Sequence, residues 1–135
     1  MPLMTWTQQL SVGVKVLDDD HKKLIGMLNQ LNDGMKAGQG RQTLGKVFDE
    51  LVDYTKMHFA REEQFFAETG YGAAEAHKKE HDDLTMRVLD LQTRHNNGAL
   101  ALSKEVINFL QGWLIYHIQG SDQKYRPHLN ANGIQ

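Results

Sequence analysis

Apolar residues recur at helical spacing through four long segments of this 135-residue chain, and little in the sequence interrupts them. The two prolines are Pro2 and Pro127, so the interior lacks the residue that most strongly breaks helices. The breaks fall at three glycine-containing stretches, 37–40, 69–72 and 96–98, whose composition is typical of turns. No period-two alternation, which would indicate strands, competes with this pattern. The chain is therefore predicted to be all-α.

Short loops between long helices predict an up-down-up-down antiparallel four-helix bundle. We expect one domain over 1–135, with an N-terminal arm over 1–17 and helices at approximately 18–37, 41–67, 73–95 and 100–125. The acidic run 18–20 suits the positive end of the first helix dipole. The last helix is expected to end by Pro127.

Histidines extend the apolar stripes of all four predicted helices, instead of lying on the charged faces. With two carboxylates they form a set of seven polar residues near the helix ends: His21, His58, Glu62, His77, His81, His117 and Asp122. In an up-down-up-down bundle, the starts of the first and third helices share one end with the finishes of the second and fourth. All seven side chains are therefore predicted to meet at one end of the core.

The spacings within this set mostly agree with convergence. His58 with Glu62, and His77 with His81, are four residues apart, or about 40° around a helix, so both members of each pair can reach one centre. His117 and Asp122 are five apart, about 140° around an ideal helix. A widened helical turn at Gly120 is the expected remedy.

Burying five imidazoles and two carboxylates is costly unless something neutralises them, and a metal would do so. A buried hydrogen-bonded network is the competing explanation. The chain contains no cysteine, which excludes thiolate sites, and imidazole with carboxylate suits iron, manganese or zinc. Seven ligands exceed the needs of one ion, so two ions are predicted, with carboxylates able to bridge them. A bridging oxygen would leave one position open for a small ligand.

These motifs resemble those of hemerythrins, particularly the single-domain bacteriohemerythrins, over nearly the whole chain. Trp6, the run 11–14 and Leu17-Asp18-x-x-His21 resemble the family's arm and its entry into the first helix. The resemblance extends to three ligand motifs, in order and type: His58-Phe59-x-x-Glu62, His77-x-x-x-His81 and His117-x-x-x-x-Asp122.

The resemblance implies two iron ions and reversible binding of dioxygen. By it, His77, His81 and His117 would ligate the coordinatively full iron, and His21 and His58 the other. Glu62 and Asp122 would bridge both ions, beside an oxo or hydroxo group. Dioxygen would bind as a hydroperoxide at the five-coordinate iron.

The resemblance also suggests an apolar oxygen pocket formed by Trp113, Leu114 and Ile118, for which core packing is the plain alternative. Phe59 is open to the same two readings.

Two histidines are not expected to be ligands. His95 lies about 27 Å along the third helix from His77, and His128 follows Pro127 as an expected surface residue. Tyr125 is either a hydrogen-bond partner of the centre or a buried tyrosine.

Storage of oxygen, or delivery to an oxygen-consuming enzyme, is the expected role, and no enzymatic activity is expected. The alternatives are a di-iron oxidase or ferroxidase, whose bundles usually carry Glu-x-x-His motifs absent here, and a free-standing oxygen or iron sensor. A formal charge of −2 gives no reason to expect nucleic acid as a partner. Without a visible signal peptide or membrane span, a cytoplasmic monomer with no stable membrane insertion is expected.

Overall fold

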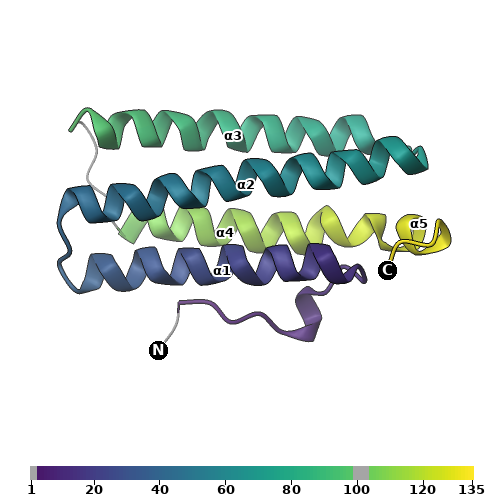
Figure 1. Ribbon diagram of the computed structural model, residues 1–135, viewed down its shortest axis with the longest axis horizontal. Coiled ribbons are helices and arrows are strands. Elements are labelled where there is room, and N and C mark those ends of the chain that lie inside the picture. The colour runs from purple at the N-terminus through teal and green to yellow at the C-terminus, as the bar shows by residue number, and fades with distance from the viewer. Residues whose placement is uncertain (1–2, 99–103) are drawn as a thin grey trace.

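The computed structural model describes residues 3–98 and 104–135, and four long helices dominate it. They are α1 (Lys15–Lys36), α2 (Arg41–Thr69), α3 (Ala74–Asn96) and α4 (Lys104–Gly120). In Figure 1 they run side by side along the long axis, and successive helices run in opposite directions. The predicted antiparallel four-helix bundle is confirmed, and no strand occurs among the described residues. The predicted start of the last helix, at 100, lies outside them.

An N-terminal arm runs along the bundle before α1, and contains the short 3-10 helix η1 (Gln8–Leu10). Asp18, in the first turn of α1, accepts hydrogen bonds from the Ser11 hydroxyl at 2.6 Å and the Val12 N–H at 2.8 Å. Val12 is fully buried, so this carboxylate satisfies a backbone donor that water does not reach. Asp18 therefore anchors the arm as well as facing the positive end of the helix dipole.

Replacing Asp18 by alanine should lower the free energy of unfolding by about 2 kcal/mol, because it leaves the buried Val12 N–H without a partner. Asp19→Ala is the matched control, since Asp19 is exposed and pairs only with surface lysines; its effect should stay within about 0.5 kcal/mol. Urea denaturation of both variants checks this, and equal losses would contradict it.

The second helix ends in a left-handed glycine that turns the chain toward α3. Gly70 has a φ of 68°, and the N–H groups of Gly70 and Tyr71 both donate to the Phe66 carbonyl, at 2.8 and 3.1 Å. A side chain at this position would be strained, which explains glycine here. The turn fixes where α3 starts, and therefore the positions of His77 and His81 in the first turns of α3.

The fourth helix does not continue to 125 as predicted. It ends at Gly120, and a 3-10 helix, η2 (Asp122–Tyr125), follows after Ser121. The expected widened turn is therefore wrong in kind, because the chain tightens into i→i+3 bonding instead. Glycine is a poor helix former, so α4 ends readily there.

The fourth helix ends before Pro127 as expected, but a further short helix begins at Arg126. Pro127 lies in the first turn of α5 (Arg126–Ala131), where its missing N–H costs nothing. His128 is on this helix and half-buried, with its Nε2 3.0 Å from the Thr69 carbonyl, so its expected place as a surface residue beyond the helix is wrong. Over 3–98 and 104–135, no helix has the length and apolar character needed to cross a bilayer.

Candidate metal centre

The structure brings all seven predicted polar residues together inside one end of the bundle. Each is at most 3% exposed: His21 on α1, His58 and Glu62 on α2, His77 and His81 on α3, His117 on α4, and Asp122 at the start of η2. Because α4 ends before Asp122, the carboxylate five residues after His117 returns to the same centre. His117 Nε2 and Asp122 Oδ1 are 2.9 Å apart.

The potential ligand atoms form two groups that share both carboxylates. In the larger group, Glu62, His77, His81, His117 and Asp122 have donor atoms within 4.8 Å of one another. Within it, His77 Nε2 is 2.9 Å from Asp122 Oδ1, and His81 Nε2 is 3.0 Å from Glu62 Oε1. Three imidazoles thus face one side of the carboxylate pair.

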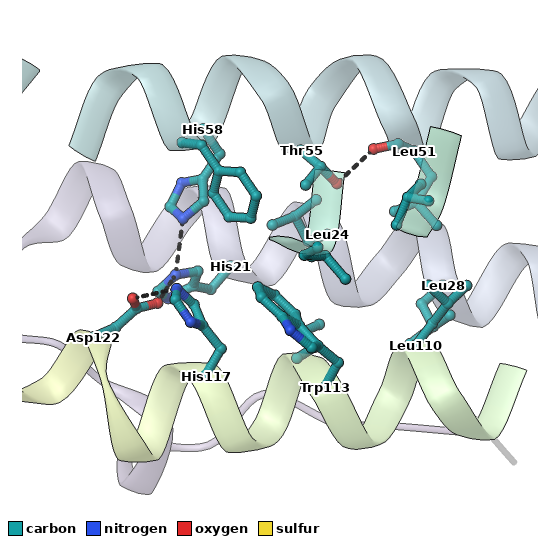
Figure 2. A pocket seen from close by; sticks show the side chains of 14 residues that line it. His21, Leu24, Leu28, Leu51, Thr55, His58, Leu110, Trp113, His117 and Asp122 are labelled. Atoms are coloured by element: carbon teal, nitrogen blue, oxygen red, sulfur yellow. Dashed lines mark hydrogen bonds and ion pairs between the residues drawn. The ribbon is translucent and has the colours of Figure 1, made fainter. Parts of the chain in front are cut away.

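The smaller group holds two imidazoles on the other side of the same carboxylates. His21, His58, Glu62 and Asp122 form it. His21 Nε2 lies 3.1 Å from His58 Nε2 and 3.2 Å from Asp122 Oδ2. Figure 2 shows His21, His58, His117 and Asp122 turned toward one point. The two groups of potential ligands therefore share both carboxylates and contain three and two imidazoles respectively.

Within the described part of the chain, several of these buried atoms have no hydrogen-bond partner, and this observation tests whether a metal fits. They are Glu62 Oε1, both oxygens of Asp122, and the Nε2 atoms of His77, His81 and His117. Their lone pairs approach one another without the geometry of hydrogen bonds, an arrangement that is unfavourable for a buried polar network. Metal ions would satisfy these atoms together, so the donor set fits a metal and not a purely hydrogen-bonded cluster.

The electrostatics of the centre also favour added positive charge. Burial opposes ionisation of Glu62 and Asp122, yet the surrounding imidazoles hold the pKa of each carboxyl below its ordinary value. Burial alone would lower the pKa of His77, but the nearby carboxylates of Asp122 and Glu62 raise it to about 9. The two carboxylates therefore attract either protons or metal cations into the core.

Two further carboxylates, which were not expected from the sequence, accept hydrogen bonds from the outer nitrogens of two of the potential ligand imidazoles. His58 Nδ1 donates to Asp20 at 2.9 Å, and His81 Nδ1 donates to Glu63 at 2.9 Å. Such partners orient an imidazole and leave its other nitrogen free for a metal. The signal that could have found Asp20 and Glu63 is their position directly beside ligand candidates in the sequence.

Tyr125 and His117 also have polar neighbours close to the centre. The buried Tyr125 hydroxyl donates to Glu62 Oε2 at 2.6 Å, so this tyrosine is both a buried residue and a partner of the centre. Glu80 lies 3.8 Å from His117 Nδ1 and accepts a hydrogen bond from Ser121 at 2.8 Å. Both contacts tie η2 and the residue before it to the ligand helices.

An apolar cavity of about 40 Å³ lies beside the centre. His21, His58, His117 and Asp122 form its polar end, and Figure 2 shows Trp113, Leu24, Leu28, Leu51 and Leu110 extending from it along the bundle. Trp113 and Leu114 line it, being four and three residues before His117 on the same face of α4. Ile118, predicted with them, is fully buried but is not a lining residue.

Phe59 both lines this cavity and stacks on His81, with ring centroids 3.8 Å apart. His95 is buried elsewhere: it contacts Arg41 at the start of α2, with its Nε2 donating to the Arg41 carbonyl at 3.2 Å. His95 belongs to neither group of potential ligands in the described part of the chain.

Comparisons with known proteins agree with this fold and centre. A family model described as the hemerythrin HHE cation binding domain matches residues 12–129. The chain is 39% identical over 132 residues to bacteriohemerythrins of Stenotrophomonas maltophilia, covering 98% of this chain and 85% of that relative, and of Methylococcus capsulatus, covering 97% and 100%. A crystal structure of a wild-type hemerythrin matches with a TM-score of 0.89 at 39% identity, covering 94% of this chain and 98% of that one.

The chain therefore belongs to the hemerythrin family. Together with the two groups of histidine, glutamate and aspartate, this membership points to a non-haem metal centre.

Proposed function

We propose that the protein binds dioxygen reversibly at a non-haem di-iron centre. The observation that carries this proposal is the pair of donor groups sharing Glu62 and Asp122, placed at the end of an apolar cavity. In this assignment His77, His81 and His117 hold one iron, and His21 and His58 hold the other. Glu62 and Asp122, which belong to both groups of potential ligands, would be shared by the two irons.

The unequal imidazole count supports an open position on one side only. Three imidazoles face one iron and two face the other, and both members of the smaller group, His21 and His58, line the cavity. The iron pair would supply two electrons to bound oxygen and recover them on release. The apolar walls, with Trp113 and Leu114 among them, would keep water away from the ligand and oppose its loss as peroxide.

Binding, and not catalysis, is the function that this donor set favours. Five neutral imidazoles stabilise ferrous iron better than the carboxylate-rich shells of bundle oxidases. Storage of oxygen, or delivery to an oxygen-consuming enzyme, is the role we propose, carried out by a monomer. The family membership and the buried centre support this assignment, and an oxidase remains an outcome of its test.

The experiment is a cycle of oxygenation followed by absorption spectroscopy. Iron-loaded, anaerobically reduced protein should be colourless, gain visible absorption bands when oxygen is admitted, and lose them when oxygen is removed. His58→Ala should abolish the reversible bands, whereas His128→Gln, a histidine outside the centre, should leave them intact. Rapid irreversible oxidation with substrate turnover would instead identify an oxidase, and failure to take up iron would refute the metal centre itself.

A further inference from the structure

A buried carboxylate, Asp20, connects one ligand candidate to the surface of the bundle. Its Oδ2 accepts a hydrogen bond from His58 Nδ1 at 2.9 Å. Its Oδ1 accepts from the Tyr54 hydroxyl at 2.8 Å and from Arg61 Nη1 at 3.0 Å. Tyr54 and Arg61 lie one helical turn before and after His58, so a single side of α2 offers three donors to one carboxylate of α1.

These contacts determine which nitrogen of His58 carries a proton. Asp20 is an acceptor for Nδ1–H, which leaves the lone pair of Nε2 free, and Nε2 is the atom facing Glu62 and His21 in the centre. His21 has no such support, because its buried Nδ1 has no hydrogen-bond partner among residues 3–98 and 104–135. The two imidazoles of the smaller group are therefore inequivalent.

Burial distinguishes Asp20 from the other carboxylate that supports an imidazole. The Asp20 side chain is 3% exposed, whereas that of Glu63, which accepts from His81 at the same distance of 2.9 Å, is 30% exposed. Solvent screens a partly exposed carboxylate, so Asp20 should influence its histidine more strongly than Glu63 does. Tyr54 and Arg61 donate hydrogen bonds to Asp20 and so weaken its pull on the His58 proton, as solvent does for Glu63 and His81.

We propose that Asp20 is a positioning residue that holds the proton of His58 on Nδ1. Asp20 thereby sets how strongly the lone pair of Nε2 binds the ion in the smaller group. Tyr54 and Arg61 limit this effect, because they donate hydrogen bonds to the same carboxylate. The inference rests on the proposed metal centre for its effect on iron. Its effect on the tautomer of His58 does not depend on metal.

Asp20→Asn is the sharpest variant because asparagine keeps the shape and offers only one acceptor oxygen. Arg61 can only donate, and both Arg61 and Tyr54 should donate to this oxygen, as they do to Asp20 Oδ1. The amide NH2 group is then expected to face His58 Nδ1. His58 must then accept at Nδ1 and place its proton on Nε2, where the metal would bind. Nitrogen-15 NMR of the metal-free protein reads this change directly, with Glu63→Gln as the matched control.

The expected result is Nδ1–H at His58 in the wild type and in Glu63→Gln, and Nε2–H in Asp20→Asn. Iron affinity should fall about 10- to 100-fold in Asp20→Asn. Retention of Nδ1–H in Asp20→Asn would overturn the inference. The tautomer alone decides it if the wild type binds no iron, an outcome that would refute the proposed function separately.

Tyr54→Phe tests the moderating role and guards against an effect of misfolding. Removing its hydroxyl leaves Asp20 less neutralised, so Asp20 should hold the His58 proton more tightly and strengthen donation from Nε2. The reduction potential of the iron-loaded protein should therefore fall in Tyr54→Phe and rise in Asp20→Asn. Shifts of the same sign in both variants would indicate general disruption and would overturn the proposal.

Discussion

Replacing Glu62 by glutamine is expected to reduce the iron content from two ions per chain to at most one. Glu62 is fully buried and is one of two carboxylates common to both groups of potential ligands. A neutral amide cannot bridge two cations as a carboxylate does, so both sites lose a ligand at once. The loss of affinity should exceed the roughly 10- to 100-fold caused by changing an outer partner of a ligand. Elemental analysis after iron loading measures it.

The control for this change is Glu68→Gln, on the same helix but exposed, where the carboxylate only accepts from Gln64. It should bind two irons with the affinity of the wild type. Asp122 repels Glu62, but the surrounding imidazoles outweigh this repulsion and hold the pKa of Glu62 below its ordinary value, so the neutral amide should lower the stability of the metal-free protein and folding must be checked separately. Circular dichroism should show equal helicity. Two tightly bound irons in Glu62→Gln would show that the shared carboxylate is not a ligand.

The fold class could be predicted because helical periodicity and glycine breaks act locally, and each helix carries its own apolar stripe. The end of α4 could not be located in the same way. The sequence placed Asp122 about 140° from His117 on an ideal helix, which showed that the geometry had to change near Gly120. It did not show whether the helix would widen or end, because tertiary contacts of η2, such as that between Tyr125 and Glu62, help to decide this.

The convergence of seven side chains followed from topology, since antiparallel helices place alternate starts and finishes at one end. The outer carboxylates could not be found by the same argument. Asp20 and Glu63 belong to acidic runs that periodicity assigns to polar helix faces, and their partners lie on other helices. Hydrogen bonding between helices depends on side-chain reach and local packing, which spacing along one helix does not describe.

Iron removal is expected to lower the melting temperature by about 10–20 °C. A ligand that binds only the folded state, present at about a thousand times its dissociation constant, adds roughly 4 kcal/mol, which corresponds to a shift of this size for a domain of about 135 residues. The physical reason lies in the buried carboxylates and Nε2 atoms that are left without partners when the ions leave. Calorimetry of iron-loaded and metal-free protein measures the difference.

The difference should be larger at pH 9 than at pH 6. In the metal-free protein the pKa of His77 is raised from 6.5 to about 9, so its stabilising charge is fully present below pH 6.5 and is lost as the pH rises through about 9. Glu62 and Asp122 have lowered pKa values, so their contribution is present at both pH values and is lost only in acid. At pH 6 a proton on His77 partly replaces the metal charge, and at pH 9 about half of this replacement is lost. An equal difference at the two pH values would show that protons and metal do not compete for this centre.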